Sequence, residues 1–189
     1  MSTFNGGYEM SEVTDELEIV REFVNTAELG SGSDQLDAPS TLLAWLAEHA
    51  LIEEGATASE KDLERTRALR EALRALLYAN SGGELDPKAP PVLDAAAARA
   101  DLRLCFGADG DAGLMSCTAG VNGALGRLLA IVAEAMRAGT WARLKACRSD
   151  DCRWAFFDGS KNHSRAWCSM ALCGNRAKAR AFRERQAGA

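Results

Sequence analysis

Four cysteines near the C-terminus constrain the fold of this chain more strongly than any other feature. They form two pairs, Cys147/Cys152 and Cys168/Cys173, with four residues inside each pair and fifteen residues between the pairs. Two closely spaced pairs separated by a short insert allow a chain to present four thiolates tetrahedrally to one zinc ion. Four thiolates close the coordination shell and leave no position for water or substrate, so we expect one structural zinc.

The segments around these cysteines predict a treble-clef-like zinc module. Residues 147–152 are rich in turn-forming types, so a tight turn can aim both sulfur atoms of the first pair inward. Residues 154–157 predict a short strand, residues 158–163 a turn and residues 165–167 a returning strand. From Ser169 onward the pattern is helical, which places the second cysteine pair at the start of a helix.

The spacing alone leaves two other roles open for the cysteines. Four buried thiols can act as small apolar side chains, but a segment of about forty residues rarely folds without a metal or disulfides. Disulfides require an oxidising compartment. The N-terminus has no basic region followed by an apolar stretch, and the longest apolar run, residues 128–133, is too short to cross a bilayer. We therefore expect a cytoplasmic protein with reduced thiols and no membrane partner.

The net charge of −5 is divided unevenly along the chain. Residues 1–141 contain eleven Lys or Arg and twenty-three Asp or Glu, whereas residues 142–189 contain eleven and four. The two parts therefore carry net charges of −12 and +7. This asymmetry indicates that the C-terminal part faces a polyanion. Attraction between the two parts, or solubility alone, is the alternative explanation.

Much of the basic charge lies on the predicted C-terminal helix. Arg176, Arg180 and Arg183 fall on one helical stripe, and a slim arginine-rich helix suits DNA phosphates or a major groove. Phe182 is expected to anchor this helix to the rest of the protein. Basic residues of the zinc module can add phosphate contacts. The residues predicted to bind DNA are Arg153, Lys161, Arg165, Arg176, Lys178, Arg180 and Arg183. RNA is an alternative partner, because contacts to phosphates distinguish it poorly from DNA.

The first 141 residues predict a predominantly helical domain with one β-hairpin, so we assign the chain to the α+β class. Residues 1–15 are polar and are predicted to be disordered. Apolar residues at helical spacing predict helices at residues 16–28, 39–49, 59–80, 92–99 and 121–138. Alternating apolar residues on both sides of a glycine-rich turn predict the hairpin at residues 101–118. The predicted domains are residues 16–141 and, for the zinc module, residues 143–186.

Several polar residues of the helical domain allow two interpretations. Asn25 and Thr26 lie late in the first helix, where they either brace the helix end or line a ligand pocket. His49 is expected at a helix C-terminus, where a cation is favoured, rather than in a metal site. The arginines of the third helix, interleaved with glutamates, predict a solvated face that comprises Arg65, Arg67, Arg70 and Arg74.

The cysteine segment also resembles a known family. The sequence WCSMALCGNR at residues 167–176 resembles the signature of the CGNR zinc-finger family. The upstream cysteine pair, the Arg-Trp dipeptide after it and residues 157–162 extend the resemblance through the segment 143–186. Phe-Val-Asn-Thr at residues 23–26 resembles the opening motif of the ABATE domain, which family members typically carry at their N-terminus. These members are bacterial proteins described as stress-induced transcription regulators.

The resemblance and the charge asymmetry together imply a bacterial transcription regulator. The zinc module would bind DNA, and the acidic N-terminal domain would sense a small molecule or a partner protein. A homodimer is expected, because one short helix offers few base contacts. The alternative is a zinc-stabilised protein–protein interaction module without nucleic-acid binding. We expect no enzyme activity, because the sequence shows no Ser/His/Asp constellation, no paired catalytic carboxylates and no Walker loop.

Overall fold

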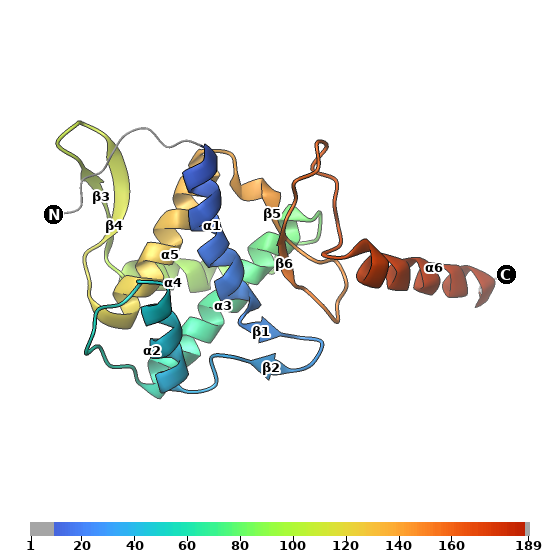
Figure 1. Ribbon diagram of the computed structural model, residues 1–189, viewed down its shortest axis with the longest axis horizontal. Helices are drawn as coiled ribbons and strands as arrows, with labels where there is room; N and C mark the ends of the chain where they lie inside the picture. The colour runs from blue at the N-terminus through green and yellow to red at the C-terminus, as the bar shows by residue number, and fades with distance from the viewer. Residues whose placement is uncertain (1–9, 188–189) are drawn as a thin grey trace.

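Five helices form the body of the protein. The computed structural model describes residues 10–187, and the helices of its body are α1 (Met10–Asn25), α2 (Pro39–Glu48), α3 (Glu60–Asn80), α4 (Ala89–Arg99) and α5 (Gly120–Arg137) (Figure 1). The predicted helices of this part are therefore present. Because α1 begins at Met10, residues 10–15 are helical where the sequence predicts a disordered tail. The remainder of that predicted tail, residues 1–9, lies outside the described residues.

The core lies between α1, α3 and α5, whose apolar stripes face one another. Phe23 of α1, Leu73 and Leu77 of α3 and Leu128 of α5 are completely buried. The start of α3 is fixed by a capping box, in which Ser59 Oγ accepts from the Asp62 amide and the Asp62 carboxylate accepts from the Ser59 amide. Most of the stability of such helices comes from burying these stripes against one another.

In the part of the chain that the structure describes, the strands form three separate antiparallel pairs. Strands β1 (Ala27–Glu28) and β2 (Ser33–Asp34) make a minimal pair directly after α1. Strands β3 (Leu102–Phe106) and β4 (Ala112–Ser116) form the hairpin that the alternation predicts. The third pair, β5 (Leu144–Ala146) and β6 (Ala155–Phe157), belongs to the zinc module.

The strand pairing of the zinc module differs from the prediction. Residues 165–167 form no strand, and β6 pairs instead with β5, which precedes the first cysteine. All three residues of β5 are buried, because this strand lies against the helical domain. The cysteine turn at residues 147–152 therefore lies between the two strands. After β6 the chain continues through a loop to η2 (Met170–Gly174) and α6 (Asn175–Ala187).

The apolar core continues from the helices into the zinc module. Leu144, Ala146 and Ala155 belong to the same buried cluster as the leucines of α3 and α5. Strand β5 lies beside α3, and β6 lies beside α1 (Figure 1). A second, smaller cluster surrounds the cysteines and includes Phe156 and Trp167. The zinc module is thus docked on the helical domain by shared apolar packing.

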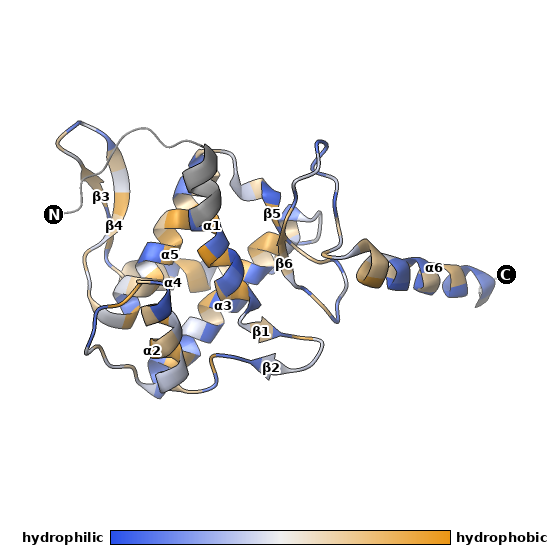
Figure 2. Ribbon diagram, in the orientation of Figure 1, coloured by the Kyte–Doolittle hydropathy of each residue, from blue (hydrophilic) through white to orange (hydrophobic). Residues whose placement is uncertain are grey.

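Helix α6 has a different character from the helices of the body. It extends away from the body of the molecule (Figure 1), and its sequence is mostly hydrophilic (Figure 2). Within residues 10–187, no helix combines the length and the apolar character that are needed to cross a membrane.

Candidate zinc centre and nucleic-acid interface

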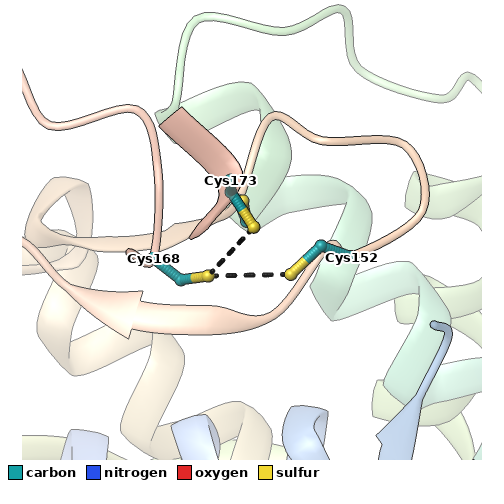
Figure 3. A group of neighbouring side chains, drawn as sticks. Cys152, Cys168 and Cys173 are labelled. Atoms are coloured by element: carbon teal, nitrogen blue, oxygen red, sulfur yellow. Dashed lines mark hydrogen bonds between the residues drawn. The ribbon is translucent and has the colours of Figure 1, made fainter. Parts of the chain in front are cut away.

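The thiols of the four predicted ligands meet in one cluster. The sulfur atoms of Cys147, Cys152, Cys168 and Cys173 all lie within 4.8 Å of one another. Cys168 Sγ is 3.6 Å from Cys152 Sγ and 3.7 Å from Cys173 Sγ (Figure 3). A tetrahedron with Zn–S bonds of about 2.3 Å has edges of roughly 3.8 Å, whereas a disulfide requires about 2.05 Å. The cluster therefore fits one zinc ion, and its cysteines are free thiols.

Two backbone turns bring the cysteine pairs together. Cys147 directly follows β5, and its amide donates to the carbonyl oxygen of Trp154 at 2.9 Å, which closes the turn that also contains the second cysteine. Cys173 lies in η2, a single π-helical turn in which the Gly174 amide donates to the Ser169 carbonyl at 3.1 Å. Such turns are rare and are often found at functional sites. Here the π turn carries the last of the four ligands.

The residues after Cys173 stabilise this turn. A Cβ atom at Gly174 would lie 2.4 Å from Met170 Sδ, so glycine leaves the room that the methionine side chain occupies. The Asn175 amide donates to the Ala171 carbonyl at 3.1 Å and satisfies a carbonyl of the same turn. The Cys-Gly-Asn segment therefore works as one unit that joins the metal cluster to α6.

Burial and hydrogen bonding separate the pKa values of the thiols. Burial and hydrogen bonds with Cys147 and Cys152 raise the pKa of Cys173 to about 11. Burial and a hydrogen bond with Cys152 also raise the pKa of Cys168. Burial acts in the same direction on Cys147, but the backbone amides of Cys168 and Ser149 outweigh it and hold the Cys147 pKa below its ordinary value. Zinc binding to these thiols therefore has to release protons.

A buried ion pair holds the loop between β6 and the second cysteine pair. Lys145 Nζ lies 2.7 Å from Asp158 Oδ2, and both side chains are almost fully buried. Lys145 also donates to the carbonyl oxygen of His163, while Asp158 accepts from the amides of Ser160 and Arg165, each at 3.0 Å. These contacts fix the loop that positions Cys168. This pair could not be predicted from the sequence, since thirteen residues separate its members and no local pattern links them.

Asn25 connects the helical domain to the zinc module through a single residue of β6. Its Nδ2 donates to the Ala155 carbonyl at 2.9 Å, and its Oδ1 accepts from the Ala155 amide at 2.8 Å. Both residues are buried. The side chain thereby pairs with β6 in the way a neighbouring strand would.

Arg74 forms a second connection between the two parts of the chain. Its guanidinium donates to the carbonyl oxygens of Val24 and Ala27 at 2.6 and 3.1 Å, and to that of Arg153 at 3.1 Å. The Arg153 guanidinium in turn lies 3.4 Å from the centroid of the Tyr78 ring. These contacts tie the cysteine turn to α3, in addition to the apolar packing of β5.

Comparison with protein families identifies both parts of the chain. A family described as a putative stress-induced transcription regulator, ABATE, matches residues 18–139. The chain belongs to the ABATE family. The CGNR zinc finger matches residues 143–186, so the arrangement of an N-terminal ABATE domain and a C-terminal CGNR zinc finger that the resemblance implies is confirmed. A search of curated proteins gave no match.

The basic residues of the CGNR zinc finger fall into two groups. The side chains that lie exposed on the loop or on α6 are Lys161, Arg165, Arg176, Lys178, Arg180 and Arg183. Arg153, by contrast, faces the ABATE domain, where it stacks on Tyr78 and pairs with Asp150. Phe182 is 57% exposed, so the prediction that it anchors α6 is wrong.

Several polar residues of the ABATE domain are buried, although their spacing in the sequence predicts that they are exposed. The Thr26 hydroxyl donates to the Phe23 carbonyl at 2.8 Å and accepts from Arg70 at 3.1 Å. Arg70 is buried and binds both carboxylate oxygens of Asp34. The prediction that Arg70 and Arg74 belong to a solvated face is therefore wrong, because each finds buried acceptors that lie far away in the sequence. Asn25 lines a pocket of about 350 Å³, and Thr26 does not.

Proposed function

We propose that this ABATE protein is a transcription regulator whose CGNR zinc finger binds DNA through α6. The observation that carries the proposal is the placement of this helix, which extends from the body (Figure 1). Its residues Arg176, Arg180 and Arg183 are exposed, and their spacing puts them on one side of a helix. Its thirteen residues correspond to a rod of roughly 20 Å, and an α-helix of this kind fits the major groove. The positive charge of residues 142–189 supports the same partner.

In this proposal the zinc centre has a structural role. Four thiolates would hold one zinc ion in a closed shell, so the ion would fix the turn from which α6 starts and would not bind substrate. The ABATE domain, docked on the zinc finger through Asn25 and Arg74, would sense a ligand or partner. The protein would act by binding and not by catalysis.

The test is DNA binding by a variant in which Arg176, Arg180 and Arg183 are replaced by alanine. Duplexes selected from random sequence by the zinc-loaded protein serve as probes in fluorescence polarisation across a salt series. The logarithm of the binding constant falls linearly with the logarithm of the salt concentration, and each phosphate contact makes this slope steeper by about 0.9. If all three arginines contact phosphates, the slope for the variant should be shallower by about 2.7. Alanine favours helix as well as arginine does, so α6 is retained.

A matched control removes the same charge from the ABATE domain. The exposed residues Lys88, Arg103 and Arg137 lie far from α6 in the sequence, and their replacement by alanine should leave the affinity nearly unchanged. Equal losses in both triple variants would show that only net charge matters and would reject the assignment of α6. A zinc-loaded protein that selects no duplex at low salt would reject DNA binding altogether.

A protein–protein interaction module is the second candidate, and exposed apolar side chains favour it. Met170, Leu172 and Phe182 are 50%, 61% and 57% exposed on η2 and α6. Large apolar side chains that are exposed on neighbouring elements are found at surfaces that bind another protein. In this function the basic α6 would also dock on an acidic protein surface, such as residues 1–141 of a second copy. It therefore predicts self-association that weakens with salt, measured by sedimentation, together with an absence of nucleic-acid binding.

A further inference from the structure

A pocket lies where the ABATE domain faces the zinc finger. Its volume is about 350 Å³, which is within the range of ligand sites for small molecules. Helix α1 contributes Arg21, and α2 contributes Trp45 and Glu48. The zinc finger contributes Trp154, directly before β6. A ligand in this pocket would therefore touch both parts of the protein.

The aromatic side of the pocket combines apolar surface with an unused donor. Trp45 is only 8% exposed and is held between Phe23, with ring centroids 5.4 Å apart, and His49, at 4.0 Å. Among residues 10–187, its indole N–H forms no hydrogen bond, and it does not belong to the buried atoms that lack a partner, so solvent reaches it. A donor that is open at the wall of a cavity can donate to an acceptor on a bound ligand. Trp154 is half-buried and adds apolar surface.

Some of the charged side chains that line the pocket are already paired with other side chains, and others have donors or acceptors that are not. Glu22 lies 2.9 Å from Nε2 of His49 and is committed to it. Arg21 donates to Glu18 through Nε and Nη2, and in the described part of the chain Nη1 has no partner. The Glu48 carboxylate forms neither a hydrogen bond nor an ion pair with any described residue, and it does not pair with Arg21. One cation donor on α1 and one carboxylate on α2 are thus available at the same cavity.

We propose that this pocket binds a zwitterion of the amino-acid type. The ligand's carboxylate would accept from Arg21 and from the indole N–H of Trp45, and its ammonium group would donate to Glu48. Glu48 is the last residue of α2, where the partial negative charge of the helix end also favours a cation. An apolar ligand side chain would lie on Trp154. Charge-assisted hydrogen bonds at both ends of the ligand supply orientation as well as affinity.

The position of Trp154 links this pocket to the zinc finger. The next residue, Ala155, is held by Asn25 of α1, and the carbonyl of the preceding residue accepts from Arg74. A ligand that contacts Trp154 would add to these contacts and stabilise the docked zinc finger. This inference deepens the sensing role of the proposed function and rests on it. Ligand binding is measured without DNA, so that either proposal can fail without the other.

The first experiment measures the melting temperature of the zinc-loaded full chain with each standard L-amino acid at millimolar concentration. At least one amino acid should raise the melting temperature, because a ligand that binds only the folded protein stabilises it. Calorimetry then compares the best ligand with its N-acetyl derivative, which lacks the ammonium charge, and with its carboxamide, which lacks the carboxylate. Each derivative should bind at least about tenfold more weakly.

Two variants locate the two charges of the ligand. Glu48→Gln should weaken the free amino acid at least about tenfold but should leave the N-acetyl derivative unchanged, because the lost contact is the one to the ammonium group. Arg21→Gln should weaken the free amino acid and leave the carboxamide unchanged. Glu64→Gln removes an exposed carboxylate on α3 and should bind as the natural protein does.

Three results would overturn the proposal. They are the absence of a shift with every amino acid, equal binding of the free amino acid and both derivatives, and unchanged binding by Glu48→Gln. Because Glu48 is exposed and has no partner among residues 10–187, its replacement should not disturb folding. If the protein bound an amino acid but selected no DNA, the assignment of the pocket as an amino-acid site would stand. Only its role in regulation would be rejected.

Discussion

Asn25 binds one residue of the zinc finger with both the oxygen and the nitrogen of its side-chain amide. The donor and the acceptor face the carbonyl and the amide of Ala155 at 2.9 and 2.8 Å, and both residues are buried. Hydrogen bonds contribute modestly when they are formed, but a buried group that loses its partner costs about 1–3 kcal/mol. Asn25 is therefore more important for joining the two domains than for the helix in which it lies.

Replacing Asn25 by alanine should destabilise the protein by about 2–4 kcal/mol, because it leaves two buried backbone groups unpaired. The measurement is urea unfolding of the zinc-loaded protein. Asn162→Ala is the matched control, since Asn162 is exposed and should tolerate the change. A difference of less than about 0.5 kcal/mol between the two variants, which is the usual effect of a surface substitution, would show that water replaces the lost contacts.

Asp158 makes the stability of the zinc finger depend on pH. Burial opposes its ionisation, but hydrogen bonds from Lys145 and Ser160 outweigh burial and hold the Asp158 pKa well below its usual range. A carboxyl group whose pKa is lower in the folded state stabilises the protein above its unfolded pKa of about 3.9. This contribution is lost as the pH falls through that value toward the folded pKa.

The substitution Asp158→Asn should cost about 3–5 kcal/mol at neutral pH, because it leaves Lys145 as a buried charge without its partner. The difference in unfolding free energy between the natural protein and this variant should narrow as the pH falls below about 4. Denaturant unfolding at a series of pH values measures this difference in unfolding free energy. The control is Asp94→Asn, since Asp94 is exposed. A difference that stays constant with pH would contradict the role assigned to the ion pair.

At the scale of elements, η2 and α6 depend on the metal cluster more than any helix of the body. Cys173 is buried in η2, whereas the side chains of α6 are mostly exposed. An isolated helix of this length is marginal in water, so its order comes from its attachment to the zinc turn. Strands β5 and β6 have an independent anchor, because they are part of the ABATE core.

Removal of zinc should therefore release one part of the zinc finger and not the other. After treatment with a chelator, amide hydrogens of residues 168–187 should exchange rapidly, and those of β5 and β6 should keep most of their protection. Hydrogen exchange followed by mass spectrometry resolves the two segments. A chelator that has been saturated with zinc serves as the control. Loss of protection throughout α3 would show instead that the metal holds the whole fold together.

The elements that could be predicted from the sequence are those whose signals are local. The helices follow from apolar periodicity, and the four cysteines follow from a spacing that depends only on nearby turns. The partner of β6 could not be predicted, because β5 is selected by burial against α3 and not by its own pattern. Arg70 and Arg74 were wrongly assigned to a solvated face, and the burial of Lys145 was not predicted, for a related reason. A charge is buried only where acceptors from distant segments converge.

At the scale of the whole molecule, the point in the chain where the net charge changes sign is not a boundary between two apolar cores. The charge changes sign near residue 142, but the apolar core passes through this point, because Leu144, Ala146 and Ala155 complete the cluster of the ABATE helices. Arg74 also has an acceptor on each side of the boundary. The zinc finger is therefore part of the ABATE core as well as a separate site, and a signal can pass between the two without a flexible linker.

Two truncations test this shared core. A protein that ends at residue 141 loses the burial of Leu144 and leaves Arg74 without one acceptor, so it should be at least about 3 kcal/mol less stable than the full chain and should bind an apolar dye. A protein that ends at residue 176 lacks most of α6, whose side chains are largely exposed, and should unfold at the same urea concentration as the full chain. If residues 1–141 alone were as stable as the full chain, the zinc finger would be an independent module, and a ligand in the ABATE domain would have no rigid contact through which to influence it.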